Sequence, residues 1–156
     1  MSPTLVFIGG GWHVPASYSK LINALQTAGY DVHFPVHPSM VCLSPVSSIC
    51  LSLLIVFRFQ QDQNRPPTND LATDTAALRK YVGDLVNKGH TVTVLMHSYG
   101  GQVGTNALFD MGVESRAREN LSGGVSLLIY MCAFALLENG SMIKKVEVCT
   151  VYFSPP

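Results

Sequence analysis

The sequence predicts an α/β fold, with a mostly parallel sheet and helices on both of its faces. Short apolar runs rich in β-branched residues alternate along the chain with segments whose apolar residues recur at helical spacing. The runs show no strict alternation of apolar and polar residues, which is typical of strands covered on both faces. Helical connections of this kind join the strands of a parallel sheet.

The first half of the chain supplies two strands and one helix. Residues Thr4–Ile8 form an apolar run that ends at three consecutive glycines. An amphipathic helix follows, and Gly29 stands where its C-terminal cap is expected. Residues Asp31–Val36 predict a second short strand, with Pro35 at its end or on a sheet edge. The apolar helix face consists of Tyr18, Leu21, Ile22 and Leu25.

The second half continues the alternation. A long helix is predicted from Leu71 to Val86, and Gly89 stops it. A strand over Thr91–Leu95 and a helix over residues 99–111 follow. The long apolar run Val125–Phe134 predicts a further strand.

Composition excludes some classes of function. The length of 156 residues suits one domain. Of these residues, 47% are hydrophobic and 13% are charged. Lysine plus arginine number 10, as do aspartate plus glutamate, so no net field favours nucleic acid. No basic region precedes the first apolar run, so no secretory signal is predicted and the cytoplasm is the expected compartment.

The cysteines and the glycine run do not predict a metal or a cofactor. The cysteines form no Cys-x-x-Cys pair and have no histidine at metal-ligand spacing, so we predict reduced, buried thiols. A dinucleotide fingerprint fails because Val14 stands at the third glycine of G-x-G-x-x-G. The four cysteines are Cys42, Cys50, Cys132 and Cys149.

Two segments fit the alternation poorly. Residues 40–63 separate a strand and a helix that a much shorter loop could join, and we interpret them as an insertion. Residues 144–156 predict an irregular tail. Translated intervening sequence would explain both segments. Prolines and serines interrupt the apolar part of the insertion, whereas a membrane span needs about 20 mostly apolar residues, so no membrane association is expected.

The segment Met96–Gly101 carries the clearest chemical signal. Ser98 stands between an apolar strand and a helical segment, and Gly100 follows two positions later. This pattern is typical of a nucleophile elbow, a strained turn that lifts a serine hydroxyl clear of the sheet and requires small neighbours. Ser98 is therefore the candidate nucleophile.

Attack by Ser98 also needs donors for the negative charge that develops on the substrate oxygen. The amide of Tyr99 heads the following helix and is one natural donor. The second is expected from the glycine loop, residues 9–11, where the backbone can approach a ligand closely. The alternative interpretation of this loop is a tight strand-to-helix turn.

Together these motifs resemble the α/β-hydrolase superfamily, in particular the branch of small esterases and hydroxynitrile-lyase-like enzymes that includes plant methylesterases. The resemblance covers residues 4–39 and 64–142. It implies that Ser98 is the nucleophile and that Gly11 and Tyr99 supply the oxyanion amides. It rests on Leu5–His13, Ala28–Val32, His97–Gly101 and Ile129–Phe134.

The sequence departs from the family pattern at the catalytic base. The family order is serine, acid, then histidine, but no histidine follows His97. In an extended strand His97 points to the face opposite Ser98, so we interpret it as a hydrogen-bonded core histidine. His13 is expected to line the pocket with Gly10 and Trp12.

Three other positions bear on the match. Met96 replaces the first glycine of G-x-S-x-G, and Gly9 stands where many members carry His or Pro. Glu138 follows the last predicted strand, where some hydrolases place the acid. Without a histidine to orient, we interpret it as a solvated loop carboxylate.

These observations predict a partial domain over residues 1–143, with an incomplete α/β-hydrolase fold. The expected protein is a serine esterase-like one that acts on a small carboxylic ester through an acyl-serine intermediate. We expect weak or no activity, because the base and the C-terminal strands are missing. The alternative is a non-catalytic module that binds a small molecule in the same pocket. Self-association is expected through the uncovered edge at Val125–Phe134.

Overall fold

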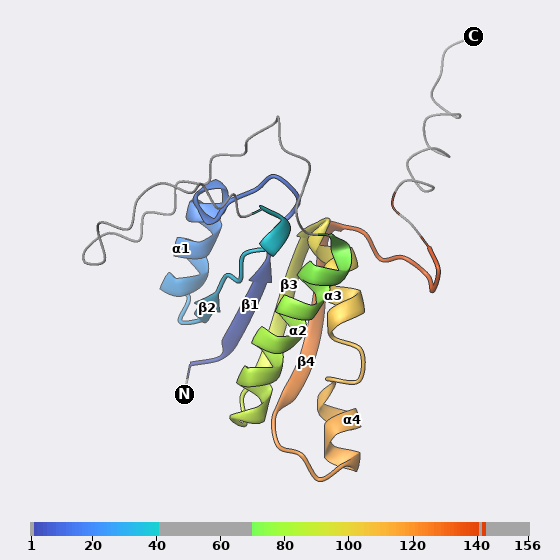
Figure 1. Cartoon of the computed structure of the whole chain (residues 1–156). Coiled ribbons are helices and arrows are strands. Elements are labelled where there is room, and N and C mark those ends of the chain that lie inside the picture. Colours follow the sequence, from blue (N-terminus) through green and yellow to red (C-terminus); the bar gives the residue numbers. More distant parts are fainter. Residues whose placement is uncertain (1, 41–69, 141, 143–156) are drawn as a thin grey trace, which may run out of the picture.

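The computed structural model describes residues 2–40, 70–140 and 142, which form a parallel sheet with helices on both faces (Figure 1). The strands in this part of the chain stand in the order β2-β1-β3-β4, and each neighbouring pair is parallel. The α/β prediction is confirmed. The strands are β1 (Thr4–Ile8), β2 (Asp31–His33), β3 (Thr91–Ser98) and β4 (Gly124–Ala133).

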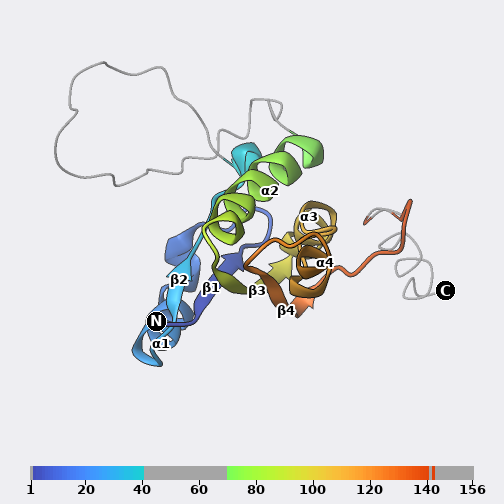
Figure 2. The ribbon, with the colours of Figure 1, turned by 90° about the horizontal axis from the view of Figure 1, so that it is seen from below.

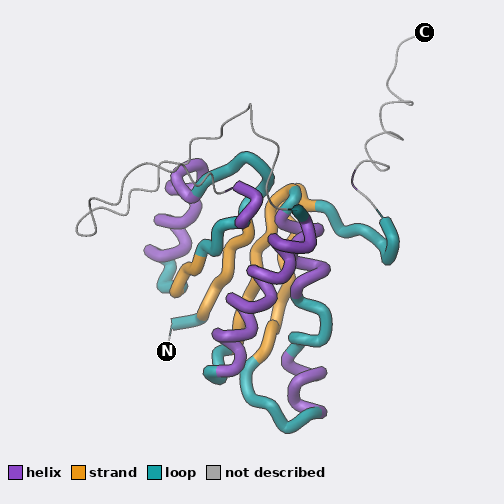
Figure 3. The backbone as a smooth tube through the Cα atoms, in the orientation of Figure 1, coloured by secondary structure: helices purple, strands orange, loops and turns teal. Residues whose placement is uncertain are grey.

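The helices cover the sheet from two sides, as Figures 2 and 3 show. A 3₁₀ turn over Pro15–Tyr18 leads into α1 (Ser19–Thr27), which packs on one face. The other face carries α2 (Leu71–Asn87) and α3 (Gly100–Ala107), with the short α4 (Val113–Arg118) beyond them.

Two apolar cores result, because successive side chains of a strand point to opposite faces. Val6 and Ile8 of β1 pack with α2 and α3, whereas Phe7 packs on the α1 side. The ring of Phe7 is fully buried, with its centroid 4.7 Å from that of Tyr18 and 5.1 Å from that of Phe34. This aromatic group lies below the glycine loop that follows β1: the Cβ position of Gly9 is 2.7 Å from Phe34 Cζ and 3.4 Å from Tyr18 Cε2.

Several elements differ from the sequence predictions, among them β3, which continues to Ser98 instead of ending at Leu95. The second strand ends at His33 instead of Val36, since Pro35 has no amide hydrogen for the sheet. The helix after Ser98 ends at Ala107, and Asp110 turns the chain with a φ of 64°. The helix α4 was not predicted, because its six residues are too few to show a helical period.

The strand β4, one of the two edges of the described sheet, leaves much of its apolar surface uncovered. Its residues Leu127, Leu128, Ile129 and Tyr130 are between 38% and 54% exposed. The prediction of buried thiols is wrong for Cys132, which is exposed because it lies on this uncovered strand.

Several predictions lie outside the described residues. They concern Cys42, Cys50 and Cys149, all but the first residue of the 40–63 insertion, and the 144–156 tail. In the described part of the chain, no helix combines the length and the apolar character that crossing a bilayer requires.

Self-association through β4 stays a prediction, and a charge on its exposed surface tests it. Leu127→Lys alters the most exposed apolar residue of the strand. We expect this change to shift oligomers toward monomers, because lysine on an edge strand opposes pairing with another strand. Sedimentation velocity over a range of concentrations measures the distribution. Leu137→Lys, at an exposed position after the strand, is the matched control, and a wild-type protein that stays monomeric throughout would contradict the prediction.

Candidate active site around Ser98

Ser98 ends β3 in a backbone conformation that residues with side chains rarely adopt. Its φ is 51°, and the pairing of β3 with β4 shifts register between His97 and Ser98. Tyr99 has helical backbone angles and is the N-cap of α3, which begins at Gly100. The chain therefore turns from strand to helix at Ser98 within one residue, which is the geometry of a nucleophile elbow.

The elbow is packed so closely against β1 and β4 that only glycine fits at two positions. A Cβ on Gly100 would lie 2.6 Å from the carbonyl oxygen of Ile8 and 2.7 Å from that of Gly9. A Cβ on Gly101 would lie 2.5 Å from the carbonyl oxygen of Phe134. Because these are backbone atoms that cannot rotate away, the two glycines allow the elbow to lie against both neighbouring strand ends.

The glycine loop after β1 lies beside the elbow. The Cβ position of Gly10 is 3.0 Å from Ser98 Cβ, and that of Gly11 is 3.8 Å from Tyr99 Cβ. Trp12 follows with a φ of 61°, and its side chain is 78% exposed. His13 Nδ1 is 3.4 Å from the Cβ position of Gly10, so the structure brings five of the predicted site residues together, whereas the indole of Trp12 is mostly in solvent.

Tyr18 links the glycine loop to the end of β3. Its hydroxyl accepts a hydrogen bond from the Gly10 amide at 3.0 Å and lies 2.8 Å from His97 Nδ1. The phenol proton is therefore available to His97, and burial raises the pKa of Tyr18, which keeps that proton in place. Burial and, to a lesser extent, the charge of His13 lower the pKa of His97. The contact with Tyr18 agrees with the hydrogen-bonded part of the interpretation of His97, but His97 is half-buried and so is not a core residue.

Two histidine rings lie near Ser98 without a hydrogen bond to it. His13 Nδ1 is 2.7 Å from the Gly11 carbonyl oxygen, so Nδ1 carries the proton and Nε2 is the basic nitrogen. The Cβ position of Gly10 is 2.9 Å from His97 Nδ1 and 3.0 Å from Ser98 Cβ. The side chains of His97 and Ser98 therefore diverge less than the alternation of a regular strand predicts, because β3 is irregular there. Among the described residues, no hydrogen bond joins the Ser98 hydroxyl to a histidine or a carboxylate.

Asp74 of α2 is a fully buried carboxylate beside the elbow, and it was not among the predicted site residues. The Tyr99 hydroxyl donates to it at 2.9 Å, and Ser39 donates through its amide at 2.8 Å and its hydroxyl at 2.6 Å. Asp74 shares the buried helix face with Leu78 and Val82, at intervals of one helical turn. An acidic residue within that apolar face was the signal that could have identified it.

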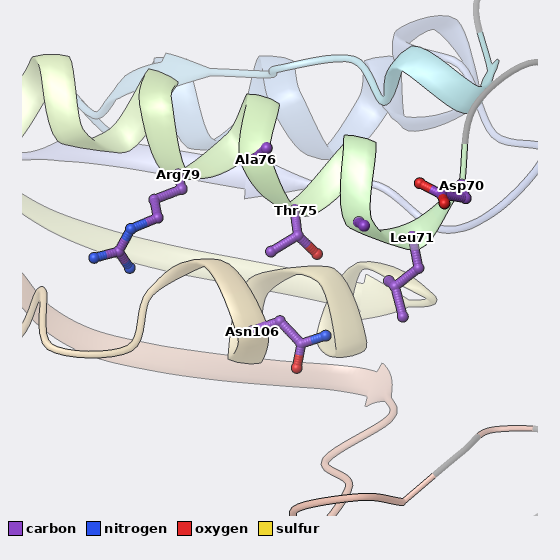
Figure 4. Close-up of a pocket in the computed structure, with 7 residues that line it drawn as sticks. Asp70, Leu71, Thr75, Ala76, Arg79 and Asn106 are labelled. Carbon is purple, nitrogen blue, oxygen red and sulfur yellow. The ribbon is translucent and has the colours of Figure 1, made fainter.

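A surface hollow of about 640 Å³ between α2 and α3 is separate from this cluster. Figure 4 shows Asp70, Thr75, Arg79 and Asn106 around it, and none of its lining residues belongs to the glycine loop or the elbow. In the part of the chain that the structure describes, no three His, Cys, Asp or Glu side chains are grouped to hold a metal ion. We take Ser98 as the centre of the candidate active site because of its positive φ and its contact with the glycine loop.

Comparison with known proteins agrees with this geometry. The sequence model described as the alpha/beta hydrolase family matches residues 5–150, which include the glycine loop and the elbow. The chain belongs to the alpha/beta hydrolase family. It is 25% identical over 147 residues to alpha/beta hydrolase nvfD of Aspergillus novofumigatus, a match that covers 94% of this chain and 49% of that protein. The chain thus spans about half the length of this curated relative. The predicted superfamily is confirmed, and the esterase and hydroxynitrile-lyase-like branch stays a prediction.

Proposed function

We propose that this alpha/beta hydrolase chain carries the nucleophile of a serine esterase that acts on a small carboxylic ester. The observation that carries the proposal is the positive φ of Ser98 at a strand-to-helix turn beside the glycine loop. Membership in the family supports it, because a serine in this position is the family's nucleophile. The proposal includes the branch of small esterases and hydroxynitrile-lyase-like enzymes, which the motifs around residues 5–13 and 97–101 resemble.

The proposed reaction begins when Ser98 Oγ attacks the ester carbonyl carbon. The carbon becomes tetrahedral, and its oxygen takes up a negative charge that the amides of Gly11 and Tyr99 stabilise. Collapse of this intermediate breaks the bond to the alcohol and leaves an acyl-serine. The proton that Ser98 loses passes through solvent to the departing alcohol, and water then releases the acid and regenerates the serine.

Proton removal is the slow point of this reaction in the 156-residue chain. The sequence has no histidine after His97, and the described residues place no hydrogen-bonded base on Ser98. A serine hydroxyl without a positioned base is a weak nucleophile, so its attack on the ester is slow. We therefore expect slow turnover.

Hydrolysis of short-chain p-nitrophenyl esters tests the proposal. We expect slow release of p-nitrophenol by the wild type and only the buffer rate from Ser98→Ala. Ser126→Ala is the matched control, because Ser126 lies near the opposite end of the sheet, where its hydroxyl donates to the Val92 carbonyl at 3.3 Å. Equal rates for the wild type and Ser98→Ala would overturn the proposal.

A non-catalytic binding module is the second candidate function. The observation that favours it is that, among the described residues, no base is hydrogen-bonded to Ser98. A binder is expected to hold a short-chain amide analogue of the ester with equal affinity before and after Ser98→Ala, and to turn over no ester at any pH. Isothermal titration calorimetry of both proteins, run beside the hydrolysis assay, separates the two functions.

A further inference from the structure

We propose that Asp74 is a positioning residue that ties together both halves of the oxyanion hole. The inference rests on the proposed function, which assigns the amides of Gly11 and Tyr99 as the two donors. These amides come from loops that follow different strands, so their relative position depends on contacts outside the strands. The buried carboxylate of Asp74 makes those contacts in two directions.

The direct arm runs from Asp74 to the elbow. The Tyr99 hydroxyl donates to Asp74 Oδ2 at 2.9 Å, which fixes the residue that carries the elbow amide. Burial, then the hydrogen bond to Asp74 and its charge, raise the pKa of Tyr99 far above its ordinary value, so the hydroxyl remains a donor. The Tyr99 ring also packs on His37 at a centroid distance of 5.4 Å, and His37 Nε2 lies 2.9 Å from the Gly9 carbonyl oxygen.

The indirect arm runs from Asp74 to the glycine loop. Ser39 donates to both carboxylate oxygens, at 2.8 Å from its amide and 2.6 Å from its hydroxyl. The next residue, Met40, lies behind the loop. Its Cε is 3.7 Å from the Cβ position of Gly11, and its sulfur accepts from the Trp12 amide at 3.4 Å. Asp74 therefore reaches Gly11 through two consecutive residues of the 3₁₀ turn Pro38–Met40.

The energetics favour a single arrangement of the two arms. Asp74 is fully buried, and a carboxylate removed from water is costly unless its oxygens accept hydrogen bonds. Its three donors come from the elbow and from the turn behind the glycine loop, so loss of either arm leaves part of the charge without a partner. Oxyanion donors stabilise a transition state only when they are already in place. In this proposal the Asp74 carboxylate holds the two donor amides in that position.

Amide hydrogen exchange tests the proposal without depending on turnover. Ser39→Ala weakens the indirect arm, and we expect about fivefold faster exchange in residues 9–12. Tyr99→Phe removes the direct arm but keeps the ring, and we expect a similar acceleration in residues 98–101. Asp74→Asn is expected to accelerate exchange in both segments. Thr27→Ala, which removes a hydroxyl bonded to the Asn23 carbonyl in α1, is the control and should change neither segment.

Failure of the positioning role and failure of the proposed function give different results. If Ser39→Ala and Tyr99→Phe leave both segments unchanged, or accelerate all amides equally, Asp74 does not position the two loops. The two single-partner variants decide this even if Asp74→Asn fails to fold. If exchange changes as expected but Ser98→Ala hydrolyses esters as fast as the wild type, the positioning role holds and the proposed function is wrong.

Discussion

Replacement of Gly100 by alanine is expected to destabilise the protein by about 3 kcal/mol, the upper end of the usual cost of overpacking. The new Cβ would lie 2.6 Å from the carbonyl oxygen of Ile8 and 2.7 Å from that of Gly9. Both atoms belong to the backbone, so the elbow and the glycine loop would have to move apart. Urea unfolding followed by circular dichroism measures the loss in the free energy of unfolding.

Gly83→Ala is the matched control for this change. In α2 the nearest atom to a Cβ on Gly83 is Met111 Cε at 3.7 Å, an ordinary contact. Alanine is favoured over glycine inside a helix by roughly 0.5–1 kcal/mol, so we expect this variant to be slightly more stable than the wild type. A Gly100→Ala protein as stable as the wild type would contradict the close packing of the elbow on β1.

The second large effect is expected for Phe7→Ala, with a loss of about 3–5 kcal/mol in the free energy of unfolding. Phe7 is fully buried, and its removal would leave a cavity between Tyr18 and Phe34. Tyr18 would lose packing on one side, so its hydrogen bonds to Gly10 and His97 are expected to weaken. Urea unfolding measures the stability, and exchange of the Gly10 amide measures the effect on the loop.

Phe109→Ala removes the same side chain from a position that is 76% exposed. We expect its stability to stay within about 0.5 kcal/mol of the wild type, because surface substitutions rarely cost more. A small loss in Phe7→Ala, or equal losses in both variants, would contradict the placement of Phe7 in the core below the glycine loop.

Local patterns in the sequence predicted the strands and the longer helices well. Residues Thr4–Ile8 were expected as a strand and form β1, and the helix expected from Leu71 to Val86 is α2. The unbroken apolar run of β1 and the helical spacing of the apolar residues in α2 are both visible in a single sequence. The ends of α3 and of β2 were harder to predict. Asp110 turns the chain after α3, and Pro35 limits the length of β2.

The candidate site likewise has one part that the sequence predicted and one part that it did not. The elbow and the glycine loop are contiguous motifs, and the structure brings Ser98 and Gly10 side by side. Asp74 lies 25 positions from Tyr99 and 35 from Ser39, so its role depends on tertiary packing that no local pattern encodes. The exposure of Cys132 has the same origin, since it depends on what covers β4.

Covalent labelling tests most directly whether the elbow presents the Ser98 hydroxyl as a nucleophile. A small alkyl fluorophosphonate forms a stable adduct with a serine whose attack is supported by oxyanion donors. We expect slow labelling because no base is bonded to Ser98 among the described residues. After prolonged incubation, peptide mass spectrometry should find one adduct, on Ser98, that is lost in Ser98→Ala. An unmodified Ser98, or labelling spread equally over other serines, would contradict the nucleophile assignment.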